Sequence, residues 1–195
     1  MRLLKILGGL LALILVGALG FYAWLGGFRS VQIERGVFGP AEIVYSTHRG
    51  PYEKIGKSWE EFSTAWQAAG LDACDSLAVY LDPPDAPKES LRSIIACRID
   101  GLPEDEQAKW RASFPGVMLP QSDALISEFP FKNYASFILA PMKVYPHMAE
   151  RMERDNLHGA LAIEEYGVDG AMETIRIIMP IGVNASAYQP LRDAF

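Results

Sequence analysis

The stretches Leu77–Leu81 (LAVYL) and Ala160–Tyr166 (ALAIEEY) are short apolar runs, and each is followed by a longer one. The two longer runs are Arg92–Ile99 (RSIIACRI) and Thr174–Ile181 (TIRIIMPI). Their lengths and their β-branched residues are typical of strands. Because the same pair of runs occurs twice, the sequence predicts an internal repeat.

The residues before the first pair predict a strand and then a helix. Ala41–Thr47 (AEIVYST) has the composition of a strand, and Pro51 stands at a favourable place for a helix start. Apolar residues then recur every three or four positions, which predicts one apolar helix face: Tyr52, Ile55, Trp59, Phe62 and Trp66. Gly70 is a suitable helix end. The first unit therefore reads strand, helix, strand, strand.

The second unit has the same predicted order. Tyr134–Leu139 (YASFIL) is its predicted first strand, and Pro141 is the predicted start of a helix. The apolar face of this helix carries Tyr145, Met148 and Met152. Gly167–Gly170 is the predicted turn between its last two strands. Together the units predict an α+β fold, a tandem strand-helix-strand-strand repeat forming one antiparallel sheet with two helices on one face.

The domain is expected over about residues 31–185, after an N-terminal segment at 1–30. Repeat one is expected at about 36–101, a connection at 102–124 and repeat two at about 125–183. The connection is acidic at first and then carries Trp110 and Phe114, which predicts a short helix. Residues 186–195 are expected to form a brief, loosely ordered tail. Any groove is expected along the seam between the repeats.

The N-terminal segment has no charged residue from Ile6 to Phe28. As a helix this run would be about 34 Å long, enough to cross a bilayer core of about 30 Å. Aromatic residues gather at its far end, as at a membrane interface: Phe21, Tyr22, Trp24 and Phe28. We expect an uncleaved single-pass transmembrane anchor. The alternative is a signal peptide cleaved near Ala18-Leu19-Gly20, although the apolar run continues past that point.

The charges that flank this segment differ only slightly. Arg2 and Lys5 precede it, whereas Arg29 and Arg35 follow it with Glu34 between them. The small positive excess at the start favours a cytoplasmic N-terminus and an exported (periplasmic or extracytoplasmic) domain. A domain on the cytoplasmic face is the alternative.

Composition excludes several classes of function. The net charge is −6, and basic residues form no cluster, so no nucleic-acid partner is expected. His48, His147 and His158 lack a metal-ligand spacing, and neither a C-x-x-C nor a G-x-S-x-G motif occurs. We therefore expect no metal and no cofactor.

The two cysteines admit two interpretations. If the loop of the first hairpin centres near Asp85–Ala86, Cys74 and Cys97 lie opposite each other, and a disulfide would suit an exported domain. The alternative, which the sequence favours, is two free thiols, one in a loop and one in a buried strand.

Four short motifs occur in one order along about Gly36–Val183. They are His48–Tyr52 (HRGPY), Tyr80–Pro84 (YLDPP), Glu164–Tyr166 (EEY) and Met179–Ile181 (MPI). In this combination the chain resembles the GyrI-like family, the effector-binding domains found alone and in multidrug-responsive regulators. The resemblance implies a small-molecule ligand held in the groove between the repeats.

One branch of that family also begins with a membrane helix, and it includes a testis-expressed endoplasmic-reticulum autophagy receptor. The chain resembles this branch at Phe129–Pro130 and at Val144–Met148 (VYPHM). No long tail of the kind that carries the receptor's adaptor motif follows the domain here. An autophagy role is therefore not expected.

Glu164 is the main candidate for a ligand contact. On a strand, Glu164 and Tyr166 share one face, and Glu165 takes the other. In the resembled family the matching glutamate faces the groove and pairs with cationic, aromatic compounds. A carboxylate in an apolar cleft favours a cation, because burial without a partner is costly. The alternative is that Glu164 is a polar residue on a solvated sheet face.

Tyr52, Trp59, Tyr80 and Tyr166 are candidate walls of the pocket. Tyr80 and Tyr166 hold equivalent places in the two repeats, although cross-strand packing explains them as well. For Trp59, core packing is the stronger interpretation. His48 is expected to bond to the backbone of its own turn, and Asp82 to end a strand.

Three functions remain open. The first is a membrane-anchored module that binds a cationic or amphipathic aromatic molecule, with protein partners unknown. The second is a hydrolase of reactive electrophiles in which Glu164 activates water and Tyr166 assists, as some GyrI-like proteins resemble such hydrolases. The third is a protein-interaction scaffold whose groove is filled by its own side chains.

Overall fold

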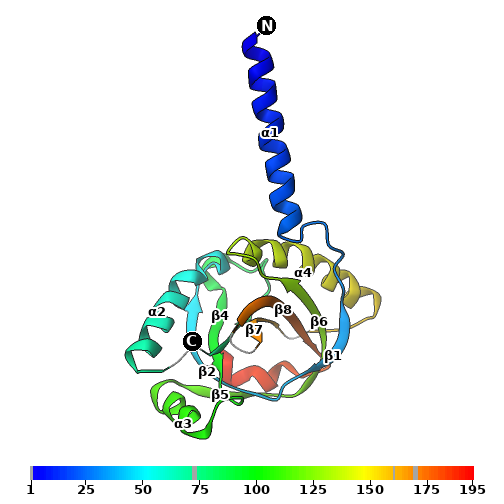
Figure 1. Ribbon diagram of the computed structural model, residues 1–195. Helices are drawn as coiled ribbons and strands as arrows, with labels where there is room; N and C mark the ends of the chain where they lie inside the picture. Colours follow the sequence, from blue (N-terminus) through cyan, green and yellow to red (C-terminus); the bar gives the residue numbers. More distant parts are fainter. Residues whose placement is uncertain (1, 72–73, 160, 169–170) are drawn as a thin grey trace.

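The computed structural model describes residues 2–71, 74–159, 161–168 and 171–195. A long helix, α1 (Arg2–Trp24), projects from a domain built on one curled sheet (Figure 1). Helices α2 (Ile55–Ala68) and α4 (Ser136–Arg154) lie outside the curl, and the C-terminal segment lies inside it.

The sheet has eight antiparallel strands in the order β1-β6-β8-β7-β3-β4-β2-β5. Their bounds are β1 Glu34–Phe38, β2 Ala41–Arg49, β3 Asp75–Tyr80, β4 Arg92–Arg98, β5 Gly116–Leu119, β6 Ser122–Pro130, β7 Ala162–Val168 and β8 Ala171–Ile181. The remaining helices are α3 Glu104–Ser113, α5 Gln189–Arg192 and the 3₁₀ turns η1 Tyr52–Lys54, η2 Lys88–Ser90 and η3 Ala185–Tyr188.

The predicted α+β repeat is confirmed. The first unit is β2-α2-β3-β4 and the second is β6-α4-β7-β8, and in the sheet their strands lie in the matching orders β3-β4-β2 and β7-β8-β6. The units meet where β3 pairs with β7, with Ala78 opposite Glu164. The short strands β1 and β5, which the sequence pattern did not predict, extend the two edges.

The predicted first strand of the second unit was wrong. Its place is taken by Ser122–Pro130, and Tyr134–Leu139 instead lies in a turn and the first residues of α4. The Ser136 hydroxyl accepts hydrogen bonds from the backbone N–H groups of Lys132 and Asn133, which favours a helix start there. The helix accordingly passes through Pro141 rather than beginning at it.

Two other predictions concern connections. The short helix expected between the units is α3. Of the predicted turn at Gly167–Gly170, residues 169 and 170 lie outside the described residues, as does Ala160 of the predicted strand before it, and β7 extends to Val168.

The sheet has a core on each face. On the outer face, Leu125, Ile175 and Ile177 are buried against Val144 and Met148 of α4. The inner face is filled by its own aliphatic residues together with the C-terminal segment. The expected loosely ordered tail was wrong: Tyr188 and Leu191 are each about 1% exposed, because the concave side of the sheet needs an apolar filling.

Cys74 and Cys97 form a disulfide across the first hairpin, with their Cα atoms 5.5 Å apart. The favoured interpretation of two free thiols was therefore wrong. Cys97 lies on β4 directly opposite Ser76 of β3, so residue 74, two positions earlier, falls within reach.

The described part of the chain has one helix apolar and long enough to cross a membrane, Lys5–Trp24, and its side chains are exposed. A signal sequence has the same properties.

Candidate ligand-binding site at the seam between the repeats

Glu164 lies at the centre of the seam, on the face of the sheet that α2 and α4 cover. It stands on β7 opposite Ala78 of β3, and its side chain is only 4% exposed. The small methyl group of Ala78 leaves room beside it for the carboxylate. The alternative of a solvated sheet face is therefore wrong.

Three phenols hold the Glu164 carboxylate. Tyr145 of α4 donates a hydrogen bond to Oε1 at 2.7 Å, and Tyr166 of β7 donates to Oε2 at 2.9 Å. Tyr80 of β3 lies 3.5 Å from the same Oε2 and 3.2 Å from the Tyr166 hydroxyl. Both repeats and one covering helix thus supply donors to a single carboxylate.

Aromatic rings enclose this cluster. Trp59 of α2 and Phe137 of α4 pack edge-on against Tyr166, with ring centroids 6.0 and 5.3 Å away. Tyr52 packs edge-on against Tyr80 at 4.8 Å. Each predicted wall residue therefore lies in or beside the cluster, with Tyr52 and Trp59 in its second layer of rings.

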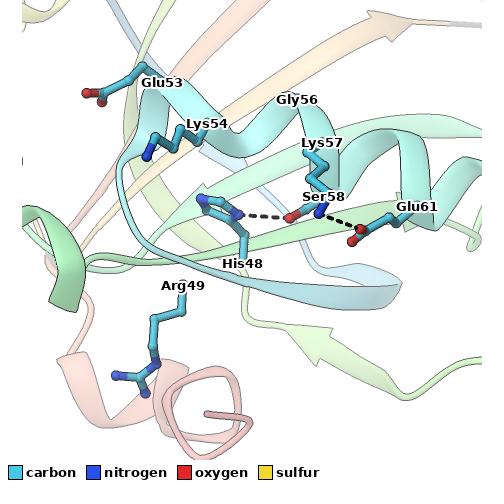
Figure 2. A pocket seen from close by; sticks show the side chains of 8 residues that line it. All are labelled: His48, Arg49, Glu53, Lys54, Gly56, Lys57, Ser58 and Glu61. Carbon is cyan, nitrogen blue, oxygen red and sulfur yellow. Dashed lines mark hydrogen bonds and ion pairs between the residues drawn. The ribbon is translucent and has the colours of Figure 1, made fainter.

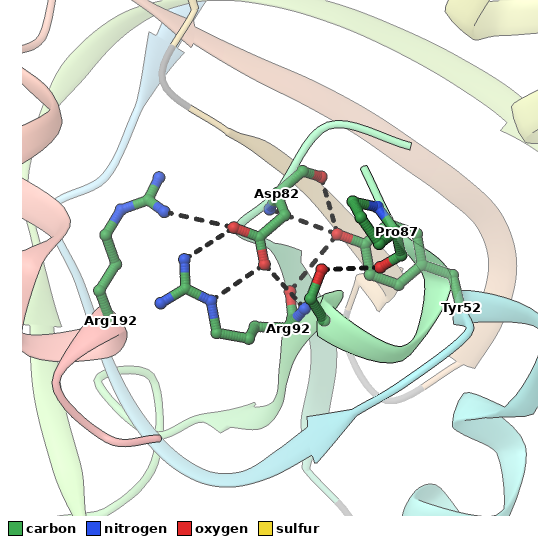
Figure 3. Close-up of polar contacts among 6 residues, drawn as sticks. Tyr52, Asp82, Pro87, Arg92 and Arg192 are labelled. Carbon is green, nitrogen blue, oxygen red and sulfur yellow. Dashed lines mark hydrogen bonds and ion pairs between the residues drawn. The ribbon is translucent and has the colours of Figure 1, made fainter. Parts of the chain in front are cut away.

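Tyr52 also has a structural task. Its hydroxyl donates to the backbone oxygen of Asp82 at 2.7 Å, which ties η1, directly before α2, to the end of β3 (Figure 3). The Asp82 carboxylate receives two guanidinium hydrogen bonds and a backbone hydrogen bond from Arg92, and Arg192 of α5 lies 3.7 Å away. Asp82 thus ends a strand, as predicted, and binds the C-terminal segment.

The electrostatics of the cluster follow from burial. Burial raises the pKa of Glu164, and the hydrogen bonds from the three phenols offset this only in part. Burial and the neighbouring carboxylate raise the pKa of Tyr80, Tyr145 and Tyr166 well above the usual value. The three hydroxyls therefore stay protonated and available as donors at neutral pH.

Glu164 has only phenols as bonded partners among the described residues. The adjacent Glu165 faces the inner side of the sheet and differs in this respect, since it pairs with Arg176 and lies 3.8 Å from Arg98. Burial raises the pKa of both carboxyls, but among the described residues Glu165 is ion-paired and Glu164 is bonded to neutral phenols.

Sequence reasoning missed two members of the site, Tyr145 and Phe137. Tyr145 was assigned only to an apolar helix face, and Phe137 to a strand that is not formed. A hydroxyl on an otherwise apolar helix face was the available signal for Tyr145, because a buried phenol needs a hydrogen-bond partner.

The other candidate residues lie away from the seam. His48 bonds through Nδ1 to the Ser58 hydroxyl at 2.8 Å and through Nε2 to the Pro51 carbonyl at 3.2 Å, so the predicted backbone role is confirmed. It borders an open hollow of about 530 Å³ (Figure 2). Charged residues form most of its lining: Arg49, Glu53, Lys54, Lys57 and Glu61.

In the described part of the chain, no group of three or more His, Cys, Asp and Glu side chains converges.

The raised pKa of Glu164 leads to a prediction for stability. The folded state keeps the proton over a pH range in which the unfolded chain has released it, so the wild type loses stability as the pH rises from about 4.5 through the folded-state pKa. Gln cannot ionise and escapes this loss. We expect the unfolding temperature of Glu164→Gln to rise relative to that of the wild type as the pH increases from 4.5 to 8.

This difference should shrink as the pH falls toward 4.5, and thermal unfolding of both proteins between pH 5 and 8 measures it. A variant whose stability depends on pH in the same way as that of the wild type would contradict a raised pKa for the buried Glu164 carboxyl.

No protein-family model matches the sequence, and no curated protein matches it. Solved structures do resemble it. The EcmrR C-terminal domain matches with a TM-score of 0.56 and 14% identity, over 79% of this chain and 99% of that one. A putative transcription regulation protein from Staphylococcus aureus matches with a TM-score of 0.51 and 15% identity, over 78% and 99%.

SAV2435 bound to tetraphenylphosphonium has a TM-score of 0.49 and 15% identity, over 78% of this chain and 93% of that one, which is too distant to carry an argument about this chain. At these identities the likenesses concern the fold. The resemblance drawn from the four sequence motifs is thus confirmed at the level of the fold: the chain folds like the EcmrR C-terminal domain.

Proposed function

We propose that this domain binds a small molecule that carries a positive charge next to aromatic or other apolar groups, and that the charge pairs with Glu164. The observation that carries the proposal is a buried carboxylate bonded only to neutral phenols among the described residues. Both repeats and both covering helices contribute rings around it.

The energetics favour a cation. Removing a carboxylate from water is costly, and hydrogen bonds from neutral donors recover only part of the cost, as the raised pKa of Glu164 indicates. A positive charge brought next to it would interact strongly, because little water screens the pair. The surrounding rings add cation–π attraction and apolar contact area.

Access requires side chains to move, because aromatic rings cover the buried carboxylate. Trp59 on α2 and Phe137 on α4 are half-buried, whereas Glu164 beneath them is buried. They form the outermost layer over the carboxylate, so a ligand would enter between the two helices by displacing these rings. Rotation of two side chains is a small rearrangement compared with opening the sheet.

Two further features support a location at the exported surface of a membrane. With α1 as a membrane anchor, the domain would stay at a bilayer surface, where amphipathic cations accumulate. The disulfide between Cys74 and Cys97 suits an oxidising compartment, which favours the exported side of the membrane.

The test compares two phenyl-substituted phosphorus compounds of different charge, tetraphenylphosphonium and neutral triphenylphosphine oxide. The full chain in nanodiscs is heated with each probe over a range of concentrations. We expect only the cation to raise the unfolding temperature. At a concentration 100 times its dissociation constant, it should increase the free energy of unfolding by about 2.7 kcal/mol.

Equal shifts with both probes would contradict a charge preference. The absence of any shift would favour the protein-interaction role. The observation that supports this role is that the side chains of the domain itself fill the seam.

A hydrolase is the second candidate, and the raised pKa of Glu164 beside three phenols favours it. A general base works best with a pKa near the working pH, and phenols can polarise an electrophile. Consumption of an electrophilic substrate by the wild type, but not by Glu164→Gln, would support hydrolysis. Equal consumption by both proteins would exclude a catalytic role for this carboxylate.

A further inference from the structure

The outer side of α4 carries an apolar stripe. Tyr134, just before the helix, and Ile138 and Met142 within it are 85%, 67% and 69% exposed. Their spacing of four residues places them along one line of the helix. The line continues at the exposed Pro146 and Ala149. A continuous row of exposed apolar side chains is typical of a surface that contacts a protein or a membrane.

The buried side of α4 lies opposite this stripe. Ser136, Ala140, Val144 and Met148 are buried, and each is two residues, or about 200°, from a stripe residue. The sheet lies beneath the buried side, so the stripe points directly away from the sheet.

The segment that follows α1 is held on α4. Lys143 Nζ donates hydrogen bonds to the backbone oxygens of Gly27 and Arg29, at 2.5 and 2.6 Å. Leu25, at the end of the apolar segment, is only 5% exposed. The segment that follows α1 is therefore packed on the domain and is not a free linker.

The orientation of the two helices gives the stripe a direction. In Figure 1, α1 leaves the domain on the side of α4 and extends away from the sheet, steeply inclined to α4. The outer side of α4 therefore faces the same direction as α1. In a bilayer crossed by α1, α4 would lie along the membrane surface with its stripe toward the lipid.

The charges around the stripe fit a lipid surface. From Phe131 to Ala149 the chain has no acidic residue, and Lys132 and His147 there are exposed. Arg29, at the exit of α1, is exposed as well. Phe28, 67% exposed, adds an aromatic ring at the same level. Apolar residues flanked by basic ones are typical of helices that lie at a bilayer interface near anionic headgroups.

We propose that the stripe of α4 (Tyr134, Ile138, Met142, Pro146 and Ala149), together with Phe28, rests in the interfacial layer of the bilayer that α1 spans. This contact goes beyond ligand binding, since it fixes which face of the domain meets the lipid. It also places the helix that supplies Phe137 and Tyr145 to the seam directly at the membrane surface.

The test places an environment-sensitive fluorophore at single introduced cysteines, in the full chain with its disulfide kept oxidised. The protein is inserted, one copy per disc, into nanodiscs of phosphatidylcholine and phosphatidylglycerol with or without brominated acyl chains. The labelled positions are Met142→Cys on α4, Ile14→Cys within α1 and Met118→Cys on β5. Met118 is 57% exposed, and β5 lies on the far side of the domain from α1.

Brominated lipid is expected to quench most of the fluorescence at positions 142 and 14 and none at 118. Adding Ile138→Glu to the Met142→Cys protein should abolish the quenching at 142 and leave that at 14 unchanged. Ile138 is exposed, so this variant tests the lipid contact without disturbing the core.

Three results would overturn the proposal. Quenching at 14 without quenching at 142 would show a spanning helix and a domain held away from the lipid. No quenching at 14 would remove the bilayer from this side of the domain. An apolar environment at 142 that brominated lipid does not quench would assign the stripe to a protein surface. None of these results depends on the ligand, so the proposed pairing of a cation with Glu164 would be unaffected.

Discussion

Replacing Glu164 by Gln is expected to weaken the binding of tetraphenylphosphonium by between about 30-fold and a few thousand-fold. The estimate follows from the cost of removing one partner of a buried charge pair, about 2 to 5 kcal/mol, with about 1.4 kcal/mol for each factor of ten. The substitution changes neither the size of the side chain nor its ability to accept a hydrogen bond from Tyr145. Calorimetric titration of the full chain in nanodiscs gives the dissociation constants.

The matched control is Glu165→Gln. Glu165 is the next residue on β7 and is also buried, but it faces the inner side of the sheet and pairs with Arg176. This variant should bind the cation like the wild type, because the carboxylate that it removes lies on the other side of the sheet from the seam. Equal loss of binding in both variants would mean that the ligand does not contact Glu164.

Reduction of the disulfide between Cys74 and Cys97 is expected to cost about 3 kcal/mol of stability. The bridge closes a loop with a sequence separation of 23, and the chain entropy released in the unfolded state sets this magnitude. For a domain of this size the unfolding temperature should fall by roughly 10 °C. Thermal unfolding with and without a thiol reductant measures the loss.

Cys74→Ala provides the control for reduction. Cys74 is half-buried whereas Cys97 is fully buried, so substitution at 74 removes the bridge with little loss of packing. The variant should unfold near the temperature of the reduced wild type and should not respond to reductant. If both cysteines of the oxidised wild type react with an alkylating agent, the bridge is absent and the prediction fails.

The repeat and the orientation of the main candidate were predictable because both depend on local alternation. The similarity of LAVYL to ALAIEEY placed two strands in equivalent positions, and the period of two put Glu164 and Tyr166 on one face. The pairing of the two halves at β3 and β7 then brought Tyr80 to the same place.

The remaining features depend on contacts distant in the sequence. YASFIL has strand composition, yet the side chains of Asn133 and Ser136 bond to nearby backbone N–H groups and start a helix instead. Tyr145 reaches Glu164 only because α4 packs on the sheet over β6 and β8, next to β7, and the helical periodicity of the sequence does not predict that contact. The disulfide depends on the register of β3 against β4, which turn residues alone did not specify.

Ala78 and Glu164 occupy equivalent positions in the two repeats but differ in charge, which has a consequence for any charged ligand. Tyr80 and Tyr166, two residues further along, correspond between the repeats, so Ala78 and Glu164 correspond as well, and they face each other across the seam. Opposite residues of an antiparallel pair have Cβ atoms about 4.5 to 5.5 Å apart, and two acids so close could not both ionise. With alanine in one repeat and glutamate in the other, this pair of positions carries a single negative charge. The seam therefore offers one negative charge at this place, and a dication bound there would leave half of its charge without a counterion.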